Sequence, residues 1–293
     1  MDATVHPERG AFFDLSARTK LRLTGADRLR YLNGQISNDA RKASDAAAVH
    51  ACVLTQKGKI NADVFIHCDG ESFIVDSDAD REELIARLDR YIIADDVQIA
   101  DVTDEFALFH FLGEASDFGD ARLVKSNRYG FDGRDLWIRK DAHDLYAQKL
   151  ATQLSFCDGD CEEVFRIERG VPRWGRELSD EIIPTEANLE ADVVDFAKGC
   201  YIGQEVISRI KMSGQTNKRL CGLITTAESP LRAGMRLTSS DAKEVGVITS
   251  AAKSSRIGAQ IGLAFLKRGH QEAGTQLMAE NAVAVQIAAL PFI

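Results

Sequence analysis

The sequence lacks a long apolar run. A membrane-spanning helix takes about 20 consecutive, mostly apolar residues, and even the apolar C-terminal stretch, residues 279–293, is interrupted by Glu280, Asn281 and Gln286. Residues 1–13 have neither the basic start and apolar centre of a signal peptide nor the Arg-rich, acid-free pattern of a transit peptide. We therefore expect no membrane contact and a cytoplasmic location.

An excess of basic charge is missing too. The formal net charge is -9 at pH 7, whereas a protein that holds nucleic acid through a broad basic face needs clustered Lys and Arg. Direct nucleic-acid binding is therefore not expected. With 293 residues, 45% of them hydrophobic and 28% charged, the chain is long enough for two or three globular domains.

Metal-binding and phosphate-binding motifs are also missing from the sequence. The six cysteines and six histidines are scattered, without CxxC pairs or metal-ligand spacing. No glycine array of the GxGxxG or P-loop type occurs. We expect reduced thiols and no metal site, since Cys157 and Cys161, in the segment CDGDC, are at most a weak hint of one.

Apolar residues recur with both strand and helix spacing in the first half of the chain. The N-terminal region predicts a short strand, a turn at Gly25 and a helix that begins near Asp27. Further on, Asp69 and Gly70 form the dipeptide that is typical of a tight hairpin turn between two strands. This part of the chain is therefore predicted to mix helices and strands.

The later elements extend this α+β pattern. A helix capped by Ser77 or Asp78 is expected after the hairpin, and the region from about residue 50 to 150 mixes strands and helices in the ferredoxin-like manner. Residues 135–139 predict a further strand at an edge of the same sheet. Beyond residue 220 helical spacing disappears and short apolar runs alternate with turns, which predicts a small C-terminal β-barrel.

A carboxylate lies on the apolar face of one predicted helix. Over residues 160–170, helical spacing puts Glu168 beside apolar side chains, at a C-terminal end where burial and the helix dipole both disfavour its charge. A salt bridge to Arg169, Arg173 or Arg176 would compensate. A ligand with two parallel donors, such as the aminopyrimidinone edge of a pterin, would do so as well. The residues alone leave both explanations open.

The segment KGCYIGQE, residues 198–205, sets Cys200 between Gly199 and Gly203 and then enters a predicted helix. Lys198 and the helix N-terminus would favour the thiolate, which could serve as nucleophile, redox sensor or metal ligand. An isolated cysteine is also commonly a small buried apolar side chain. No histidine lies near Cys200 in the sequence, so a cysteine hydrolase has little support.

Asp63 ends the segment QKGKINAD and enters an apolar strand. Its alternation with Val64 and Ile66 puts it on the opposite face of that strand. A strand aspartate commonly faces solvent. From the strand pattern alone, no role can be assigned to Asp63.

Three segments in this order carry a family resemblance: RIERGVP at residues 166–172, IPTEANL at 183–189 and DFAKGCYIGQE at 195–205. They resemble the folate-binding YgfZ/Iba57 family of the glycine-cleavage T-protein superfamily, whose signature KGCYxGQE is intact here. Aminomethyltransferases of the superfamily have a motif similar to FIGRE at the place where this chain has CYIGQE, and they are usually longer than this chain. Both differences favour the YgfZ/Iba57 branch.

The resemblance implies an α+β fold, a T-protein-like ring of three domains. A folate-binding domain would be split into residues 1–50 and 151–219, the second part holding the motif. A ferredoxin-like domain of residues 51–150 would lie between the two parts, and a C-terminal β-barrel of residues 220–293 would follow.

The resemblance also implies a site for tetrahydrofolate or a derivative. Glu168 matches the carboxylate that grips the pterin ring in aminomethyltransferases, and Asp63 is similar to the aspartate beside the reactive folate nitrogens. Arg166 and Tyr201 are expected to bind the same cofactor, and Cys200 and Asp63 are expected to carry chemistry. The other motif residues are Lys198, Gly199, Gly203, Gln204 and Glu205.

The implied function is that of a tetrahydrofolate-binding accessory protein for iron–sulfur cluster assembly or repair. Its partners would be cluster-assembly proteins or client iron–sulfur enzymes, and any support of tRNA modification would be indirect, through such an enzyme. Two alternatives stay open. One is a folate-dependent aminomethyltransferase in which Asp63 assists carbon transfer, and the other is a folate-binding module without chemistry.

Overall fold

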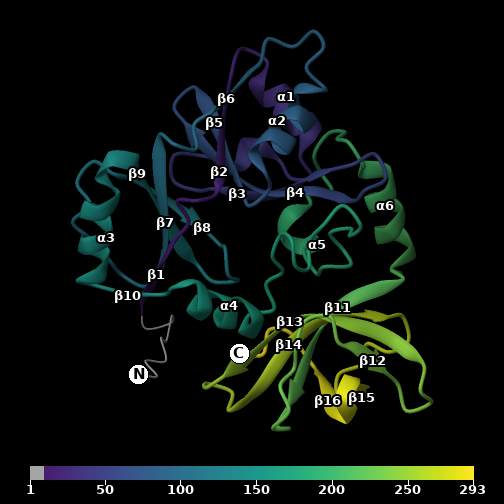
Figure 1. The fold of residues 1–293 in the computed structure, drawn as a ribbon. Helices are drawn as coiled ribbons and strands as arrows, with labels where there is room; N and C mark the ends of the chain where they lie inside the picture. Colours follow the sequence, from purple (N-terminus) through teal and green to yellow (C-terminus); the bar gives the residue numbers. More distant parts are fainter. Residues whose placement is uncertain (1–9) are drawn as a thin grey trace. The chain divides into compact units, whose positions relative to one another are not determined.

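The computed structural model describes residues 10–293. The contacts within the chain divide it into two compact units (Figure 1). The described part of the two-sheet unit comprises residues 10–158 and Ala191–Ser208. The barrel unit comprises Gly159–Glu190 and Arg209–Ile293. In Figure 1 most of the two-sheet unit is purple to teal, and the strands of the barrel unit are green to yellow.

Five antiparallel strands form the first sheet of the two-sheet unit: β2 (Thr19–Thr24), β3 (Val49–Leu54), β4 (Ile60–Asp69), β5 (Ser72–Ser77) and β6 (Gln98–Asp101). Their order across the sheet is β3-β4-β5-β2-β6. The predicted hairpin is confirmed, because β4 pairs with β5 across the turn at Gly70, whose φ is 59°.

Two helices belong to the same unit, α1 (Arg28–Gln35) and α2 (Arg81–Asp89). The first confirms the helix predicted for the N-terminal region. The second begins after Asp80, whose side chain accepts hydrogen bonds from two main-chain N–H groups of the first turn. The expected caps Ser77 and Asp78 are wrong, because strand β5 extends as far as Ser77.

Five further strands form the second sheet of the two-sheet unit: β1 (Ala11–Asp14), β7 (Phe106–Leu112), β8 (Arg122–Ser126), β9 (Gly133–Arg139) and β10 (Ser155–Phe156). Their order is β10-β1-β7-β9-β8. Leu150 of helix α3 (His143–Ala151) joins Phe109 and Phe111 in the core of this sheet. The strand predicted at residues 135–139 is β9, but it is paired on both sides, so its predicted edge position is wrong.

Six strands of the barrel unit close into a barrel: β11 (Lys218–Thr225), β12 (Arg236–Thr238), β13 (Glu244–Ser254), β14 (Ala259–Lys267), β15 (Gln276–Ala279) and β16 (Val283–Ala288). The order is β11-β14-β13-β12-β15-β16, and β16 pairs back to β11. Leu223, Ile248, Leu266 and Val285 are buried in its hydrophobic core. The predicted C-terminal barrel is thereby confirmed, and its closure leaves no open sheet edge.

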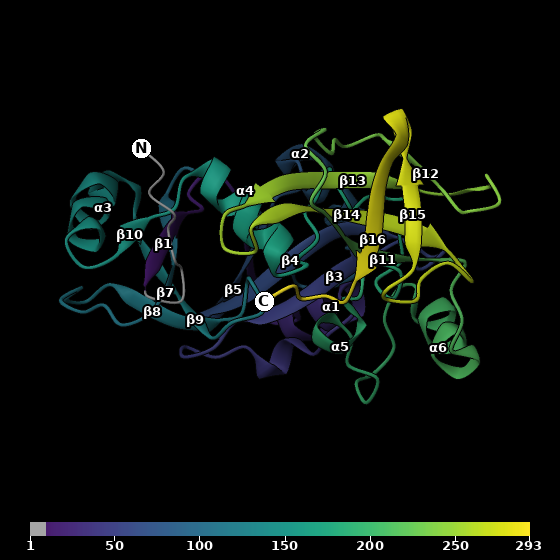
Figure 2. The same ribbon diagram turned by 90° about the horizontal axis from the view of Figure 1, so that it is seen from below.

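Helix α4 (Gly159–Glu168) packs against β13 and β14 (Figure 2). Its Ile167 is fully buried in a cluster with Leu220, Ile261 and Leu263. This packing fixes the C-terminal end of α4 on the barrel. The remaining short elements are α5 (Glu190–Val193), α6 (Gln204–Ser213), η2 (Ala40–Lys42), η3 (Lys140–Ala142) and η4 (Glu280–Ala282).

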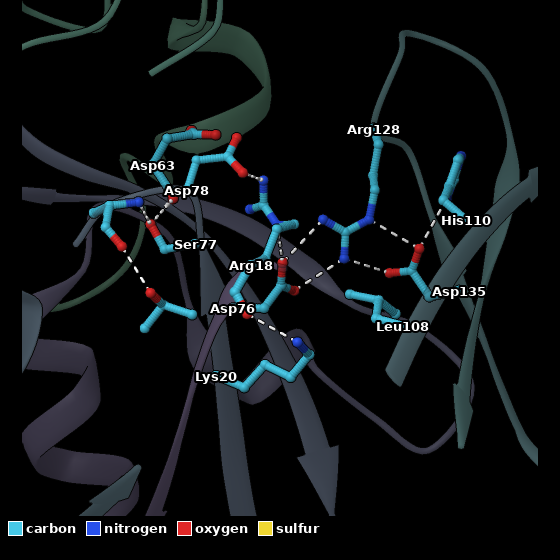
Figure 3. A network of polar contacts seen from close by, with 12 residues as sticks. Arg18, Lys20, Asp63, Asp76, Ser77, Asp78, Leu108, His110, Arg128 and Asp135 are labelled. Atoms are coloured by element: carbon cyan, nitrogen blue, oxygen red, sulfur yellow. Dashed lines mark hydrogen bonds and ion pairs between the residues drawn. The ribbon is translucent and has the colours of Figure 1, made fainter. Parts of the chain in front are cut away.

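A buried ionic network joins the two sheets of the two-sheet unit (Figure 3). Arg128, from the segment between β8 and β9, donates to Asp76 of β5 at 2.9 Å and to Asp135 of β9 at 2.8 Å. Arg18 donates to the same Asp76 at 2.6 Å. Although burial raises it, the pKa of Asp76 is held well below its usual range by Arg128 and Arg18. Arg18 also pairs with Asp78 at 2.7 Å, so two cations and three anions compensate one another.

Two histidines extend this network. Nε2 of His67 lies 2.7 Å from Asp76, and Nδ1 of His110 lies 2.8 Å from Asp135. Both imidazoles are fully buried, and burial lowers the pKa of His110. A neutral His110 orients the Asp135 carboxylate toward the arginine.

Three further features of the described residues concern membrane-spanning helices, metal ligands and cysteines. Within residues 10–293, no helix is long and apolar enough to cross a membrane, and no group of three or more His, Cys, Asp or Glu could hold a metal ion. Cys157 and Cys161 are disulfide-bonded, which corrects the expectation of reduced thiols; the chain turns into α4 between them. The free cysteines of the described residues are Cys52, Cys68, Cys200 and Cys221.

Candidate functional site

Lys198 anchors the first side of the motif loop. Its buried ammonium group donates hydrogen bonds to the main-chain oxygens of Asn33, Ile36 and Asn38, each at 2.7 Å. These oxygens lie at and just beyond the C-terminal end of α1, where carbonyls lack helical partners and a cation is favoured. Burial lowers the pKa of Lys198 to about 8. The lysine of the motif thus fastens residues 198–205 to the end of α1.

Two main-chain N–H groups hold the other side of the loop. Ile202 donates to the carbonyl oxygen of Gly34 at 3.1 Å, and Tyr201 donates to Oε1 of Gln204 at 3.2 Å. Between these bonds and the lysine anchor, Cys200 is exposed with a free thiol. The alternative of a buried apolar cysteine is therefore wrong. Cys200 is presented to solvent on a loop that is fixed at both ends.

The second glycine of the motif is required by its packing. Gly203 has a φ of 86°, and a Cβ atom there would lie 2.6 Å from the main-chain oxygen of Thr55. A larger residue would therefore collide with the chain at the end of β3. At Gly199, by contrast, an added Cβ would meet no atom within 4 Å. Close approach explains Gly203, whereas Gly199 faces open space.

Tyr201 connects the loop with strand β3. Its ring is buried, and the ammonium group of Lys198 lies 5.0 Å from the ring centroid, which is cation–π distance. Burial and, to a smaller degree, the nearby Cys52 raise the pKa of the Tyr201 hydroxyl to about 12. Cys52 lies directly opposite Asp63 in the pairing of β3 with β4. The loop and Asp63 therefore share one region of the two-sheet unit.

Asp63 is half-buried and paired, so the alternative that it simply faces solvent is wrong. Its Oδ1 lies 2.7 Å from Nε2 of His50, and both side chains are 18% exposed. The imidazole of His50 stacks on Phe65, and Oγ of Ser77 donates to the main-chain oxygen of Asp63 at 2.7 Å (Figure 3). A carboxylate held by an imidazole can accept a proton and pass it on.

Glu168 lies at the end of α4 in the barrel unit and is 2% exposed. Its Oε1 accepts a hydrogen bond from Oγ of Ser254 at 2.5 Å, and its Oε2 lies 3.4 Å from Nη1 of Arg256. Both residues belong to the end of β13 and the turn after it. The ion pair seen here was not among the predicted ones, and Arg173 pairs with two carboxylates earlier in α4.

Arg166 is buried two residues before Glu168 on the same helix. It donates to both oxygens of Glu163, to Glu177 at 3.0 Å and to Oγ of Ser250 at 2.6 Å. Ser250 in turn donates to Glu177 at 2.6 Å. These bonds hold α4 against strand β13. The guanidinium group has structural partners, and a direct contact with a cofactor stays a prediction.

The predicted site residues fall into two sets. Arg166 and Glu168 belong to the barrel unit, and Asp63 belongs to the two-sheet unit together with the motif residues Lys198, Gly199, Cys200, Tyr201, Gly203, Gln204 and Glu205. Sequence reasoning missed the partners His50, Cys52, Ser254 and Arg256. Each of these partners comes from another strand or turn, so strand register decides the contact and no local pattern reveals it.

Comparison with known proteins gives two family matches. Residues 3–118 match the GCVT N-terminal domain, and residues 218–293 match the glycine cleavage T-protein C-terminal barrel domain. The second match coincides with the closed barrel described above.

Three relatives illustrate the range of similarity. An aminomethyltransferase from Saccharopolyspora erythraea is 26% identical, with 96% of this chain and 86% of the relative covered. One from Geobacillus kaustophilus is 28% identical, with 88% and 79% covered. The mitochondrial iron-sulfur cluster assembly factor IBA57 homolog of Dictyostelium discoideum is 26% identical, with 73% and 62% covered.

A solved structure shows the same fold. The glycine cleavage system aminomethyltransferase T from Bartonella henselae superimposes with a TM-score of 0.85 at 16% identity, covering 97% of this chain and 86% of that one. This likeness shows the fold. The two domain matches, over residues 3–118 and 218–293, show that the chain belongs to the glycine-cleavage T-protein superfamily.

Proposed function

We propose that this protein binds tetrahydrofolate or a derivative and assists the assembly or repair of iron–sulfur clusters through the loop of Cys200. The observation that carries the proposal is the anchoring of this loop by Lys198 and by the N–H group of Ile202. A thiol that was merely a packing residue would not need to be exposed on a loop fastened on both sides.

The comparisons support this branch of the superfamily in part. The iron–sulfur cluster assembly factor homolog matches over most of the chain, and the motif KGCYIGQE resembles the signature of that branch. Aminomethyltransferases match over a larger share, which keeps the enzymatic alternative in view.

The chemistry of Glu168 fits a pterin. A carboxylate can accept two parallel hydrogen bonds from an aminopyrimidinone edge, and a buried carboxylate at a helix C-terminus is stabilised by such donors. Ser254 and Arg256 supply donors to the two oxygens here, and the 3.4 Å contact to Arg256 is the longer of the two. Glu168 would hold the pterin edge, while Ser254 orients the carboxylate. The bound folate would supply a one-carbon carrier.

The second candidate function is a folate-dependent aminomethyltransferase. Its support is the Asp63–His50 pair, which has the components of a proton relay. In such an enzyme Asp63 would lie beside the reacting folate nitrogens. Turnover with an aminomethylated lipoyl carrier protein, abolished by Asp63→Asn, would establish this function; the accessory role predicts no turnover.

The accessory role is tested in cells that lack the endogenous protein. We expect the wild type to restore the activity of a [4Fe–4S] enzyme and Cys200→Ala to fail at equal protein level. Cys68→Ala is the matched control, because Cys68 is also a free thiol but lies outside the motif. Full restoration by Cys200→Ala would overturn the role of the loop.

A further inference from the structure

A cavity of about 390 Å³ opens beside Cys200 in the two-sheet unit, and nothing described so far uses it. Leu29 and Gly34 of α1 contribute to its wall, and Lys198, Gly199 and Cys200 of the motif loop line it as well. Its volume is in the range of about 300–1,000 Å³ that is usual for small-molecule sites. Cys200 is thus an exposed thiol beside a cavity that can hold a small molecule.

The lining of this cavity is cationic although the whole chain is acidic. Arg30, Arg41 and Lys198 line it, together with uncharged residues and no carboxylate, in a chain of net charge -9. Lys198 is fully engaged by its three carbonyl partners, so the two arginines remain as contacts for a ligand. An electropositive, partly exposed surrounding is typical of reactive cysteines.

Acidic residues outside the cavity lining orient both arginines. Arg41 donates to Asp39 through Nε and Nη2 at 2.9 and 2.6 Å, which leaves its Nη1 for a ligand. Arg30 pairs through Nη2 with Asp95 at 2.6 Å and with Asp27 at 3.2 Å. The side chains of Arg30 and Arg41 are 68% and 63% exposed. Each guanidinium group is therefore held from one side and open on the other, the arrangement that binds carboxylates.

Two glycines leave the cavity open. A Cβ atom added to Gly34 or to Gly199 would meet no other atom within 4 Å, so neither glycine is required by close packing. Gly34 lies inside helix α1, where glycine is less favourable than alanine. Both glycines line the cavity, so side chains at these two positions would reduce its volume.

We infer that this cavity binds a small carboxylate-bearing thiol or disulfide, with its carboxylates on Arg30 and Arg41 and its sulfur beside Cys200. With a disulfide ligand the chemical step is exchange. The Cys200 thiol gives its proton to water, its sulfur attacks one ligand sulfur, and the ligand S–S bond breaks. A new S–S bond joins Cys200 to one half, and the other half leaves as a thiolate.

The inference concerns the loop of the proposed function but does not need folate, and it is tested without folate. The test compares rates of Cys200 modification by a dianionic aryl disulfide, dithiobis-nitrobenzoate, and by the neutral dithiodipyridine. The background from Cys68 is measured with Cys200→Ser and subtracted. We expect Arg30→Gln/Arg41→Gln to lower the ratio of anionic to neutral rates at least fivefold. Lys42→Gln, which removes a neighbouring charge outside the cavity lining, should leave it unchanged.

A protection experiment shows whether the cavity is occupied. S-methylglutathione carries two carboxylates and has no reactive thiol, so it can bind without exchange. We expect it to slow modification of Cys200 by the neutral reagent in the wild type and not in Arg30→Gln/Arg41→Gln. Charge selectivity without protection would overturn the inference. It would show that the arginines attract anions in general, such as an acidic segment of another protein, and that no small molecule is bound in the cavity. An unchanged rate ratio in the double variant would overturn it as well.

Discussion

Lys198 donates a hydrogen bond to the main-chain oxygen of Ile36, a residue 162 positions earlier in the chain. Its ammonium group makes two further bonds of the same length to carbonyl oxygens at the end of α1. A single buried cation thus satisfies three acceptors that the helix end leaves open. The position of Cys200, two residues later, depends on this anchor.

Replacement of Lys198 by Met tests the anchor. The change keeps an unbranched side chain but leaves three buried carbonyl oxygens without their donor, and hydrogen bonds to a charged group contribute about 1.5–3 kcal/mol. We expect the free energy of unfolding in urea to fall by about that amount. Lys42→Met is the control, because Lys42 is 58% exposed and its loss should cost less than about 1 kcal/mol. Equal losses in the two variants would contradict the anchoring role.

The two glycines of the motif give a matched pair. Gly203→Ala forces a Cβ to 2.6 Å from the Thr55 oxygen at a φ of 86°, so we expect a loss of about 1–3 kcal/mol in unfolding free energy. Gly199→Ala has open space and should change stability by less than about 0.5 kcal/mol. Thermal or urea unfolding of both variants measures the difference. A stable Gly203→Ala variant would show that the loop does not pack on β3 as described.

The inter-sheet network predicts a strong effect of one arginine. Arg128→Met removes the cation between Asp76 and Asp135 and leaves two buried carboxylates short of charge compensation. We expect a loss of about 3–5 kcal/mol in unfolding free energy. Arg139→Met is the control, since Arg139 is 64% exposed and pairs with Glu105 at 3.5 Å. A loss no larger than in the control would refute the network as a link between the sheets.

Asp39 gives a prediction about acid stability. Its hydrogen bond to Arg41 lowers the pKa of Asp39 from 3.8 to about 2. Because the folded pKa lies below the unfolded one, the ionised carboxylate stabilises the fold above pH 3.8, and this contribution is lost as the pH falls toward 2. The stability difference between wild type and Asp39→Asn should therefore be constant above about pH 5 and shrink below it. Urea unfolding at a series of pH values measures it; a difference independent of pH would argue against the depressed pKa.

Much of the fold follows from local sequence signals. The hairpin at Asp69 and Gly70, the helix that carries Glu168 and the C-terminal barrel each rest on turn residues or apolar spacing, and the structure has all three. Strand β1 was not predicted, because it is four residues long and too short to show a period. The interior place of β9 depends on pairing with β7 and β8, which no single segment encodes.

The candidate site, like the fold, was predictable from the sequence only in part. The burial of Glu168 follows from helical spacing. The glycine-flanked motif predicted a constrained loop around Cys200, but the sequence left open whether the thiol is exposed or buried, and the structure shows it exposed. The partners of the site residues could not be predicted from the sequence. Ser254 and Arg256 contact Glu168 through the packing of α4 on the barrel, and His50 contacts Asp63 through strand register. The three carbonyl partners of Lys198 belong to a segment far away in the sequence, so the anchor could be seen only in three dimensions.

The most direct measurement is calorimetric titration of the purified protein with tetrahydrofolate, comparing wild type with Glu168→Gln. The variant keeps the shape of the side chain and removes the anionic acceptor for two parallel donors. Glu244→Gln, on an exposed strand position of the same barrel, is the control and should bind as the wild type does. We predict binding by the wild type and a weakening of tenfold or more in Glu168→Gln, about 1.4 kcal/mol. No binding by the wild type, or equal binding by both Glu variants, would contradict the folate site assigned to this chain.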